Sequence, residues 1–404
     1  MRILIANKFW YQRGGLERVM LDEAEWLAGA GHEIAHFSTS HPKNDDSPWS
    51  DYFVRYRELG ADGQLGVVEK GVAAVSMFYN REAARGFGRL LRDFRPDVVH
   101  VHGIHRQISP SILGVAARAG VPVIQSLHDY HHLCPGNVLL YGGAEVCAPR
   151  RCGVFWYGGC IRGRCVQGSL PASTVAAVET AWQRLTRAYE RGITRFISPS
   201  VFVAGQMRLG GWTQPIDVVP NAVAAGSTDS APSEGFCIIG RLSPEKGIGV
   251  ALEAANRARV RVTVAGEGPA GERLRRDFPE ADFVGHLDDV SVAKLVAQSS
   301  AVIVPSIWFE NAPMSVLEAM ASGTPVIASA IGGIPEQLTH DVDGLLVAPG
   351  DVTELAQAMS RIVGEPMLAD RLGSSARETV AARFSPERHL NGLLDVYHAT
   401  LDRS

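Results

Sequence analysis

The sequence has no excess of charge of either sign and no long apolar run. Its 404 residues contain 39 Lys and Arg against 43 Asp and Glu, which gives a formal net charge of -4 at pH 7. Binding to nucleic acid needs a clear basic excess, so this balance argues against a nucleic-acid partner. No uninterrupted apolar stretch reaches the roughly 18 residues that cross a bilayer. We therefore expect a soluble or peripheral protein.

The N-terminus also lacks an export signal. It begins MRILIANKF and enters a short apolar strand pattern directly. A signal peptide would show a longer apolar region followed by small residues at a cleavage site. This pattern predicts a cytoplasmic protein.

Cysteines are few and unevenly placed. Five of the six lie between residues 134 and 165, and the sixth is Cys237. Four of the five form two equally spaced pairs, which could close a tetrahedral zinc site: Cys147, Cys152, Cys160 and Cys165. Thiols packed in an irregular loop and, last, disulfides are the alternatives, with Cys134 as a spare ligand. Because four thiolates leave no open coordination position, such a metal would be structural.

Short β-branched runs alternate with helical patterns along the whole chain. The rhythm is typical of βαβ units, and it occurs in two series separated by a small, polar segment. We expect two doubly wound α/β domains in tandem. Their boundaries are an N-terminal domain at 1–221 with a Cys-rich insert at 134–165, a linker at 222–235, a C-terminal domain at 236–384, and a final amphipathic helix at 385–404.

The most informative segment runs from residue 308 to residue 318. It leaves the strand AVIVPS and enters the helix PMSVLEAMASG, where Asn311 could cap, Pro313 fits the first turn and Gly323 could end the helix. A helix N-terminus at a strand end favours phosphate and other anions. Glu310 and Glu318 would flank a ligand there, although a pair of surface carboxylates at a helix start is the plainer alternative.

Three further loops follow strands of the second series. The turn RLSPEKG offers Arg241 and Lys246 to a diphosphate. An Arg guanidinium can donate two parallel hydrogen bonds, and a Lys ammonium acts as a point charge. The segments AGEGP, at 265–269, and FVGH, at 283–286, carry glycines that let a planar ligand approach the backbone. Each of these loops alone is a weak signal.

Taken together and in this order, RLSPEKG, AGEGP, FVG and the Glu-x7-Glu segment resemble the donor domain of the retaining GT-B glycosyltransferases of family four, the glycosyl transferases group 1. The resemblance implies two Rossmann-like domains facing a cleft, with a C-terminal helix that crosses back to the N-terminal domain. It implies transfer of a sugar from a UDP- or GDP-sugar to a glycan, lipid-linked or small-molecule acceptor, in cell-envelope polysaccharide or glycoconjugate synthesis. No cofactor is expected for catalysis.

The resemblance also implies roles for residues of the donor domain. Arg241 and Lys246 would neutralise the pyrophosphate. Glu310 would contact the transferred sugar, and Glu318 the ribose hydroxyls. The remaining donor-binding positions would hold the sugar, the phosphates and the base: Gly266, Gly268, Val284, Asn311, Ala312, Pro313, Met314 and Ser315.

The N-terminal half resembles the same family. The loop QRGGLER would turn the amides of Gly14 and Gly15 toward the donor phosphate. In the Leu-His-Asp-Tyr segment His128 is the expected active-site histidine, and His105 is expected on the acceptor side. His100 and His102 read as structural residues of a buried strand. A Cys-rich insert after His-Asp-Tyr occurs in a bacterial subset of the family, whereas Pro-Asn-Ala at 220–222 departs from the usual Pro-Asn-Gly.

A row of arginines could bring the protein to a membrane surface. The row suggests a basic amphipathic helix on anionic lipid, or a solvated helix covering the first domain: Arg81, Arg85, Arg89 and Arg92. Two other functions fit the same fold. One is a sugar-nucleotide epimerase, and the other is a catalytically inactive subunit that binds a sugar nucleotide.

Overall fold

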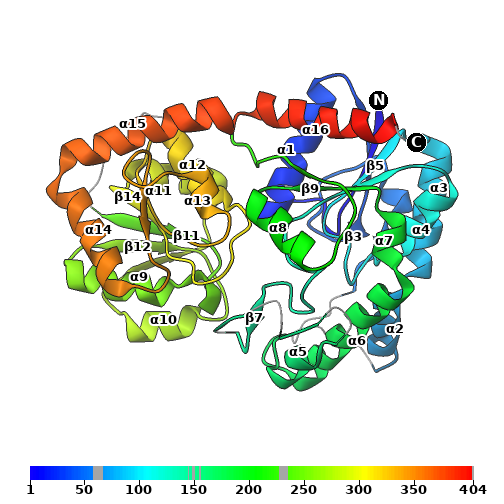
Figure 1. Ribbon diagram of the computed structural model, residues 1–404, viewed down its shortest axis with the longest axis horizontal. Helices are drawn as coiled ribbons and strands as arrows, with labels where there is room; N and C mark the ends of the chain where they lie inside the picture. Colours follow the sequence, from blue (N-terminus) through cyan, green and yellow to red (C-terminus); the bar gives the residue numbers. More distant parts are fainter. Residues whose placement is uncertain (58–66, 144, 148–150, 154–155, 227–234, 403–404) are drawn as a thin grey trace.

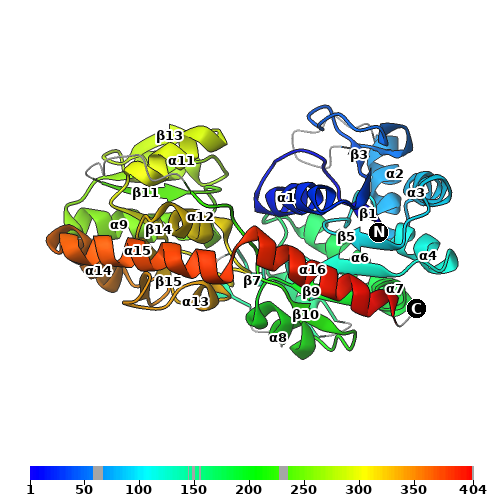
Figure 2. The same cartoon turned by 90° about the horizontal axis from the view of Figure 1, so that it is seen from above.

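The computed structural model describes residues 1–57, 67–143, 145–147, 151–153, 156–226 and 235–402. Two parallel sheets dominate it, and helices cover both faces of each (Figures 1 and 2). The architecture is α/β, with two Rossmann-like halves side by side, as the alternating pattern predicts.

The first sheet has six strands in the order β10-β9-β6-β5-β1-β2. Their bounds are β1 (Arg2–Ala6), β2 (Glu33–Phe37), β5 (Val98–Val101), β6 (Val123–Ser126), β9 (Arg195–Ser198) and β10 (Ile216–Val218). The helices of this half are α1 (Gly15–Gly29), α2 (Val67–Phe78), α3 (Arg81–Phe94), α4 (Ser111–Arg118), α5 (Gly158–Arg162), α6 (Leu170–Thr186), α7 (Ala188–Gly192) and α8 (Val201–Leu209).

The second sheet also has six strands, in the order β13-β12-β11-β14-β15-β16. Their bounds are β11 (Phe236–Ile239), β12 (Val262–Ala265), β13 (Asp282–Gly285), β14 (Ala301–Val304), β15 (Val326–Ser329) and β16 (Leu345–Val347). Around it lie α9 (Ile248–Ala258), α10 (Gly271–Asp277), α11 (Asp289–Gln298), α12 (Met314–Ser322), α13 (Ile334–Gln337), α14 (Val352–Gly364) and α15 (Pro366–Arg383).

Two small sheets complete the structure. The strands β3 (Thr39–Ser40) and β4 (Val54–Arg55) pair in parallel. The strands β7 (Leu140–Tyr141) and β8 (Glu145–Val146) form an antiparallel pair inside the Cys-rich insert.

The last helix, α16 (Pro386–Leu401), lies across the N-terminal half, as expected (Figures 1 and 2). Alternate residues of β1 face opposite sides of the first sheet, so Ile3 and Ile5 point toward α16 while Leu4 and Ala6 point away. Leu393 and Tyr397 of α16 are fully buried in the same cluster as Ile3 and Ile5. The chain end is therefore part of the core of the first half.

Candidate active site

Glycines meet where the strands β11, β12 and β13 end. The amide of Gly266 donates to the carbonyl of Gly285 at 2.6 Å. A Cβ on Gly266, whose φ is +137°, would lie 1.9 Å from the carbonyl oxygen of Gly240. A Cβ on Gly268 would lie 2.4 Å from the carbonyl oxygen of Leu242. Only glycine fits at these two positions, because the backbone after β11 packs directly against them.

The two cations of the basic turn stand in different surroundings. Lys246 ends a short 3-10 turn, and its Nζ lies 2.7 Å from Oε1 of Glu310 and 5.4 Å from the ring centre of Trp308. Arg241 is exposed, and within the described residues its guanidinium makes no hydrogen bond or ion pair. Arg241 is thus available to an anion, whereas Lys246 would have to leave its ion pair with Glu310 to bind one.

Glu310 is rigidly held. Only 4% of the residue is exposed, and its Oε1 also accepts a hydrogen bond from Ser306 at 2.5 Å. Its carbonyl accepts from the amide of Gly333 at 2.7 Å. A Cβ on Gly332, whose φ is +64°, would clash with the Glu310 backbone at 2.2 Å. The turn after β15 therefore fixes the backbone that carries this carboxylate.

The helix α12 begins two residues later than a cap at Asn311 would give, so the capping expectation was wrong. Pro313 is the N-cap residue, with φ -66° and ψ 129°, and no side chain caps the helix. A residue before proline avoids the helical region, which keeps Ala312 outside the helix. Both polar atoms of the Asn311 side-chain amide are buried without a partner in the described residues. Gly323 ends the helix with φ +76°, as expected.

The two halves touch at this helix start. A Cβ on Gly15 would lie 3.7 Å from Cγ of Met314, so the loop carrying Gly14 and Gly15 faces the N-terminus of α12. Gly14 is the N-cap of α1. The structure thus brings together, from both halves, loops that sequence reasoning had considered separately.

Glu318 pairs with a residue to which sequence reasoning gave no role. Nη1 of Arg18 lies 3.7 Å from Oε1 of Glu318 and 3.6 Å from Oδ2 of Asp289, while Gln12 donates to Asp289 at 2.9 Å. Burial raises the pKa of Glu318, and the charge of Arg18 opposes that shift. The position of Arg18 in the loop QRGGLER was the available signal.

His128 follows β6, and its Nε2 lies 2.8 Å from Nδ1 of His102. Burial lowers the pKa of His128 to about 4, so the ring is neutral near pH 7. Nearby, Tyr130 is buried with its hydroxyl unpartnered in the described residues, and its ring centre lies 6.3 Å from that of Trp308. Tyr130 and Trp308 therefore connect the two halves beside the histidine.

His105 lies in a second polar cluster on the N-terminal half. Its Nε2 is 3.6 Å from Oδ2 of Asp129 and 3.2 Å from Nδ2 of Asn137. Burial raises the pKa of Asp129 to about 6 and lowers the pKa of Lys8 to about 8. Asp129 and Lys8 sit in this cluster without having been singled out from the sequence.

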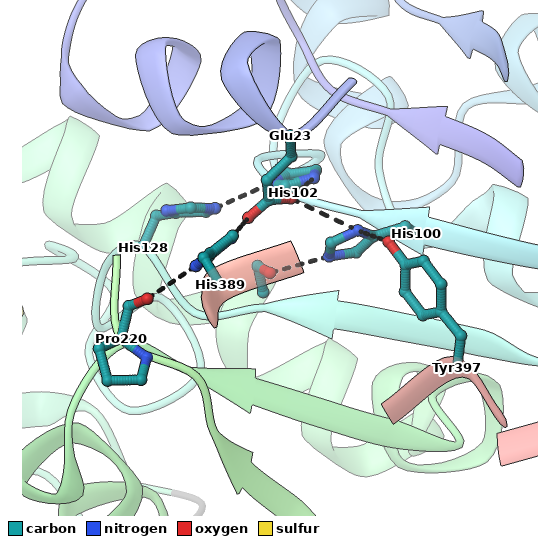
Figure 3. A network of polar contacts seen from close by, with 8 residues as sticks. Glu23, His100, His102, His128, Pro220, His389 and Tyr397 are labelled. Atoms are coloured by element: carbon teal, nitrogen blue, oxygen red, sulfur yellow. Dashed lines mark hydrogen bonds and ion pairs between the residues drawn. The ribbon is translucent and has the colours of Figure 1, made fainter. Parts of the chain in front are cut away.

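His100 and His102 are buried around the Glu23 carboxylate, in keeping with a structural reading (Figure 3). Glu23, His100 and His102 form the one group with metal-ligand spacing in the described part of the chain, with ligand atoms within 4.8 Å of one another. The hydrogen bonds of the two rings go to other groups, Ser126 for His100 and His128 for His102.

The cysteines of the insert are neighbours but do not stand as closely as zinc ligands. No disulfide joins any of the six cysteines, all of which are described. Among the described residues, no three sulfurs meet the 4.8 Å spacing that the Glu23 group meets. A hydrogen bond from the Cys160 thiol lowers the pKa of Cys165 to about 6, and burial raises the pKa of Cys147 to about 11. The zinc site stays an untested prediction.

The chain is similar to known glycosyltransferases over both halves. Residues 14–222 match the family model "Glycosyl transferase 4-like domain", and residues 233–365 match "Glycosyl transferases group 1". A GDP-mannose-dependent alpha-mannosyltransferase of Mycobacterium tuberculosis is 31% identical over 403 residues, covering 95% of this chain and 92% of that protein. A glycogen synthase of the same organism is 27% identical over 417 residues, covering 96% and 91%.

Solved structures share the fold at low identity. Sucrose-phosphate synthase from Thermosynechococcus elongatus aligns with a TM-score of 0.71 at 18% identity, over 100% of both chains. Anabaena HepE, solved in complex with UDP, aligns with a TM-score of 0.66 at 17% identity, over 99% of this chain and 100% of that one. With the glycosyl transferase 4-like model matching just over half of its length and a 31% identical relative covered almost end to end, the chain belongs to the glycosyl transferase 4-like family, carries a glycosyl transferases group 1 domain at 233–365, and is a glycosyltransferase of the GT-B fold.

Proposed function

We propose that the chain transfers a sugar from a UDP- or GDP-sugar to a glycan or lipid-linked acceptor, with retention of anomeric configuration, in the synthesis of cell-envelope polysaccharide. One observation carries the proposal. In the loop that leads into α12, and in Tyr130, whose ring faces Trp308 of that loop from the other half, buried polar atoms of Trp308, Asn311 and Tyr130 have no partner in the described residues. Unpaired buried polar groups are costly, so three such groups close to the Lys246–Glu310 pair indicate a polar ligand.

The charges around this point suit a diphosphate leaving group. Arg241 offers an unpaired guanidinium, Lys246 a second cation, and the amides at the starts of α1 and α12 a partial positive charge. Donors fixed where charge develops in the transition state are the largest expected catalytic contribution. No carboxylate besides Glu310 is assigned to the sugar, and we infer front-face transfer through an ion-pair-like transition state, with neutral His128 as a hydrogen-bonding partner.

Named relatives support the choice of donor. HepE has been solved with UDP and with UDP-glucose, and the mannosyltransferase relative is named for GDP-mannose. Base identity would depend on the loops around Gly266 and Val284, which would meet the base largely through backbone atoms. The proposal therefore covers both nucleotides.

A thermal-shift panel of UDP, GDP, ADP and CMP with their sugar conjugates tests the proposal, because a ligand that binds only the native state raises Tm. We expect UDP or GDP, with its sugar conjugate, to give the clear shift. Proton NMR of the transferred product would then report the anomeric configuration. A shift without turnover on any acceptor would favour the inactive subunit, and interconversion of the donor sugar would favour the epimerase.

We also propose that the protein acts in the cytoplasm, in contact with the inner face of the membrane. No helix of the described residues is long and apolar enough to cross a bilayer. The arginines of α3 are exposed, but Phe87 and Leu90 of the same helix are fully buried in the core. The helix α3 therefore has no free apolar face to insert.

Exposed apolar side chains lie instead on α6 and next to it on α2. They fall at helical spacing: Val175, Val178, Trp182 and Leu185 on α6, and Val72, Val75 and Tyr79 on and just after α2. The charged residues of α6, Glu179 and Arg184, are both buried. Exposed arginines flank α6 at both ends, at positions 162, 164, 187 and 191. An uncharged apolar face between arginines fits an anionic lipid surface.

Replacing Trp182 and Leu185 with glutamate is expected to abolish binding to the membrane surface. The wild-type protein should sediment with vesicles of phosphatidylglycerol and phosphatidylcholine, less at high salt, whereas the double variant should stay in the supernatant. Leu209→Glu on α8, where the leucine is 74% exposed compared with 71% for Leu185, is the matched control. Equal sedimentation of all three proteins, or of none, would contradict this surface assignment.

Zinc in the insert is a separate proposal, because the sequence gathers five cysteines within residues 134–165; burial raises the pKa of Cys147, and the neighbouring thiols of Cys134, Cys152 and Cys165 raise it further. Ligation would draw these sulfurs closer. We expect one zinc per chain by elemental analysis of protein purified without chelator, and loss of that zinc in the Cys160→Ser, Cys165→Ser variant. The buried Cys237→Ser variant should keep it. Zinc-free wild-type protein would end the proposal.

A further inference from the structure

A buried carboxylate connects the C-terminal helix, through His102, with His128 (Figure 3). Glu23 of α1 is 1% exposed, and its Oε1 lies 3.0 Å from Nε2 of His389 on α16. The other ring nitrogen of His389 lies 2.7 Å from the carbonyl oxygen of Pro220. Because a carbonyl and a carboxylate both only accept, both nitrogens of His389 carry protons. Burial lowers the pKa of His389, but the Glu23 hydrogen bond and charge leave it raised.

The second oxygen of the carboxylate faces two more imidazoles. Oε2 of Glu23 lies 3.6 Å from Nδ1 of His100 and 3.6 Å from Nε2 of His102. His100 is satisfied by the Tyr397 hydroxyl and the Ser126 hydroxyl, each at 2.8 Å. Nε2 of His102 has no hydrogen-bond partner in the described residues. The charge of Glu23 therefore decides whether the proton of His102 lies on Nδ1 or on Nε2. That charge favours the proton on Nε2 of His102.

The tautomer of His102 in turn determines the tautomer of His128. Burial holds the pKa of His102 well below its usual value, so the ring is neutral and its Nδ1 can only accept. Nε2 of His128, at 2.8 Å, must then donate to it. His128 is also neutral, and its Nδ1 is consequently the nitrogen without a proton. Within the described residues no hydrogen bond involves that atom.

We propose that Glu23 is a positioning residue for sugar transfer: acting through His102, it holds His128 in the tautomer whose Nδ1 accepts a hydrogen bond from a hydroxyl of the sugar or acceptor. The proposal rests on the proposed function in one respect, that His128 faces the reacting sugars. Its consequence is that α16, which supplies His389 to the same carboxylate, takes part in setting the active site.

The first test observes the tautomer directly and needs no substrate. In protein labelled with 15N-histidine, and with the His128 signals assigned by their loss in His128→Gln, we expect a protonated Nε2 and an unprotonated Nδ1. In Glu23→Gln the His128 signals should move toward the other tautomer. Tyr397→Phe is the matched control, because it removes a buried hydrogen bond of α16 to His100 without touching His102. It should leave the His128 signals in place.

The second test is a double-mutant cycle on kcat. Glu23→Gln and His102→Leu should each lower kcat about tenfold, the effect of one hydrogen bond to the substrate, with KM for the donor nearly unchanged. Since Glu23 acts only through His102, the double variant should be no slower than His102→Leu. Tyr397→Phe should keep wild-type kcat. Thermal unfolding of each variant separates loss of folding from loss of positioning.

Several results would overturn the proposal. In the NMR experiment they are a wild-type His128 protonated on Nδ1 or on both nitrogens, or His128 signals that do not change in Glu23→Gln. In the double-mutant cycle the contrary result is additive losses of kcat, which would indicate that the Glu23 carboxylate is purely structural. Failure of the proposed function would look different. The NMR signals would respond as described, but the wild-type protein would transfer no sugar.

Discussion

Replacing Lys246 with alanine is expected to lower kcat about a hundredfold to a thousandfold while leaving the fold intact. In the proposed reaction the leaving diphosphate gains negative charge in the transition state, and the Lys246 ammonium is one of the two side-chain cations on the turn that would hold it. Its backbone is set by Pro244 and by Gly247 with φ +66°, and the side chain belongs to no apolar core. The loss should therefore be one of charge.

The measurement is initial-rate transfer from the donor found by the nucleotide panel, with the Kd of the free nucleoside diphosphate determined by calorimetry. Lys246→Ala should weaken diphosphate binding as well as turnover, because the diphosphate carries charge before the bond breaks. Lys294→Ala on α11, an exposed lysine elsewhere in the same half, is the control. Wild-type turnover in Lys246→Ala would sink the assignment of this site.

Most of the fold could be predicted because parallel strands are buried on both faces and read as short β-branched runs. All eleven strands expected from such runs are present, from RILIA at β1 to TPVIASA at β15. The strand β16 was missed: it has only three residues, Leu345–Val347, and pairs at the sheet edge next to β15. The pairs β3–β4 and β7–β8 were missed for the same reason, since two residues give no periodicity.

Of the candidate site, the sequence could predict only the residues that stand in recognisable motifs. Lys246 and Glu310 are 64 residues apart and could be associated because each stands in a loop with a recognisable motif. Glu23 has no such context. It lies mid-helix in α1 and meets His389 after 366 residues, and a helical glutamate reads as a solvated face until the fold shows it buried. Arg18 and Asp129 were likewise missed, because Glu318, which pairs with Arg18, and His105, which pairs with Asp129, come from other parts of the chain.

Exchanging Glu310 for glutamine is expected to lower kcat about tenfold to a hundredfold. Unlike Lys246→Ala, this variant would lose a contact to the sugar and not one to the diphosphate. In the structure Oε1 of Glu310 accepts from both Lys246 and Ser306. A bound diphosphate would compete for the ammonium and leave the carboxylate to accept a sugar hydroxyl. Glutamine keeps the volume and one acceptor oxygen but loses the charge-assisted hydrogen bond, which is worth about 1.5–3 kcal/mol.

The same exchange releases Lys246 from its ion pair. Glu310→Gln should therefore bind the free nucleoside diphosphate as tightly as the wild type or more tightly, while Lys246→Ala binds it more weakly. Ser306→Ala, which removes the other hydrogen bond to Oε1, is the control for a misplaced side chain and should keep most of kcat. If Glu310→Gln instead weakened diphosphate binding as much as Lys246→Ala does, Glu310 would serve to hold the lysine in place. The free nucleoside diphosphate carries no transferred sugar, so the loss of a contact made only to that sugar could not weaken its binding.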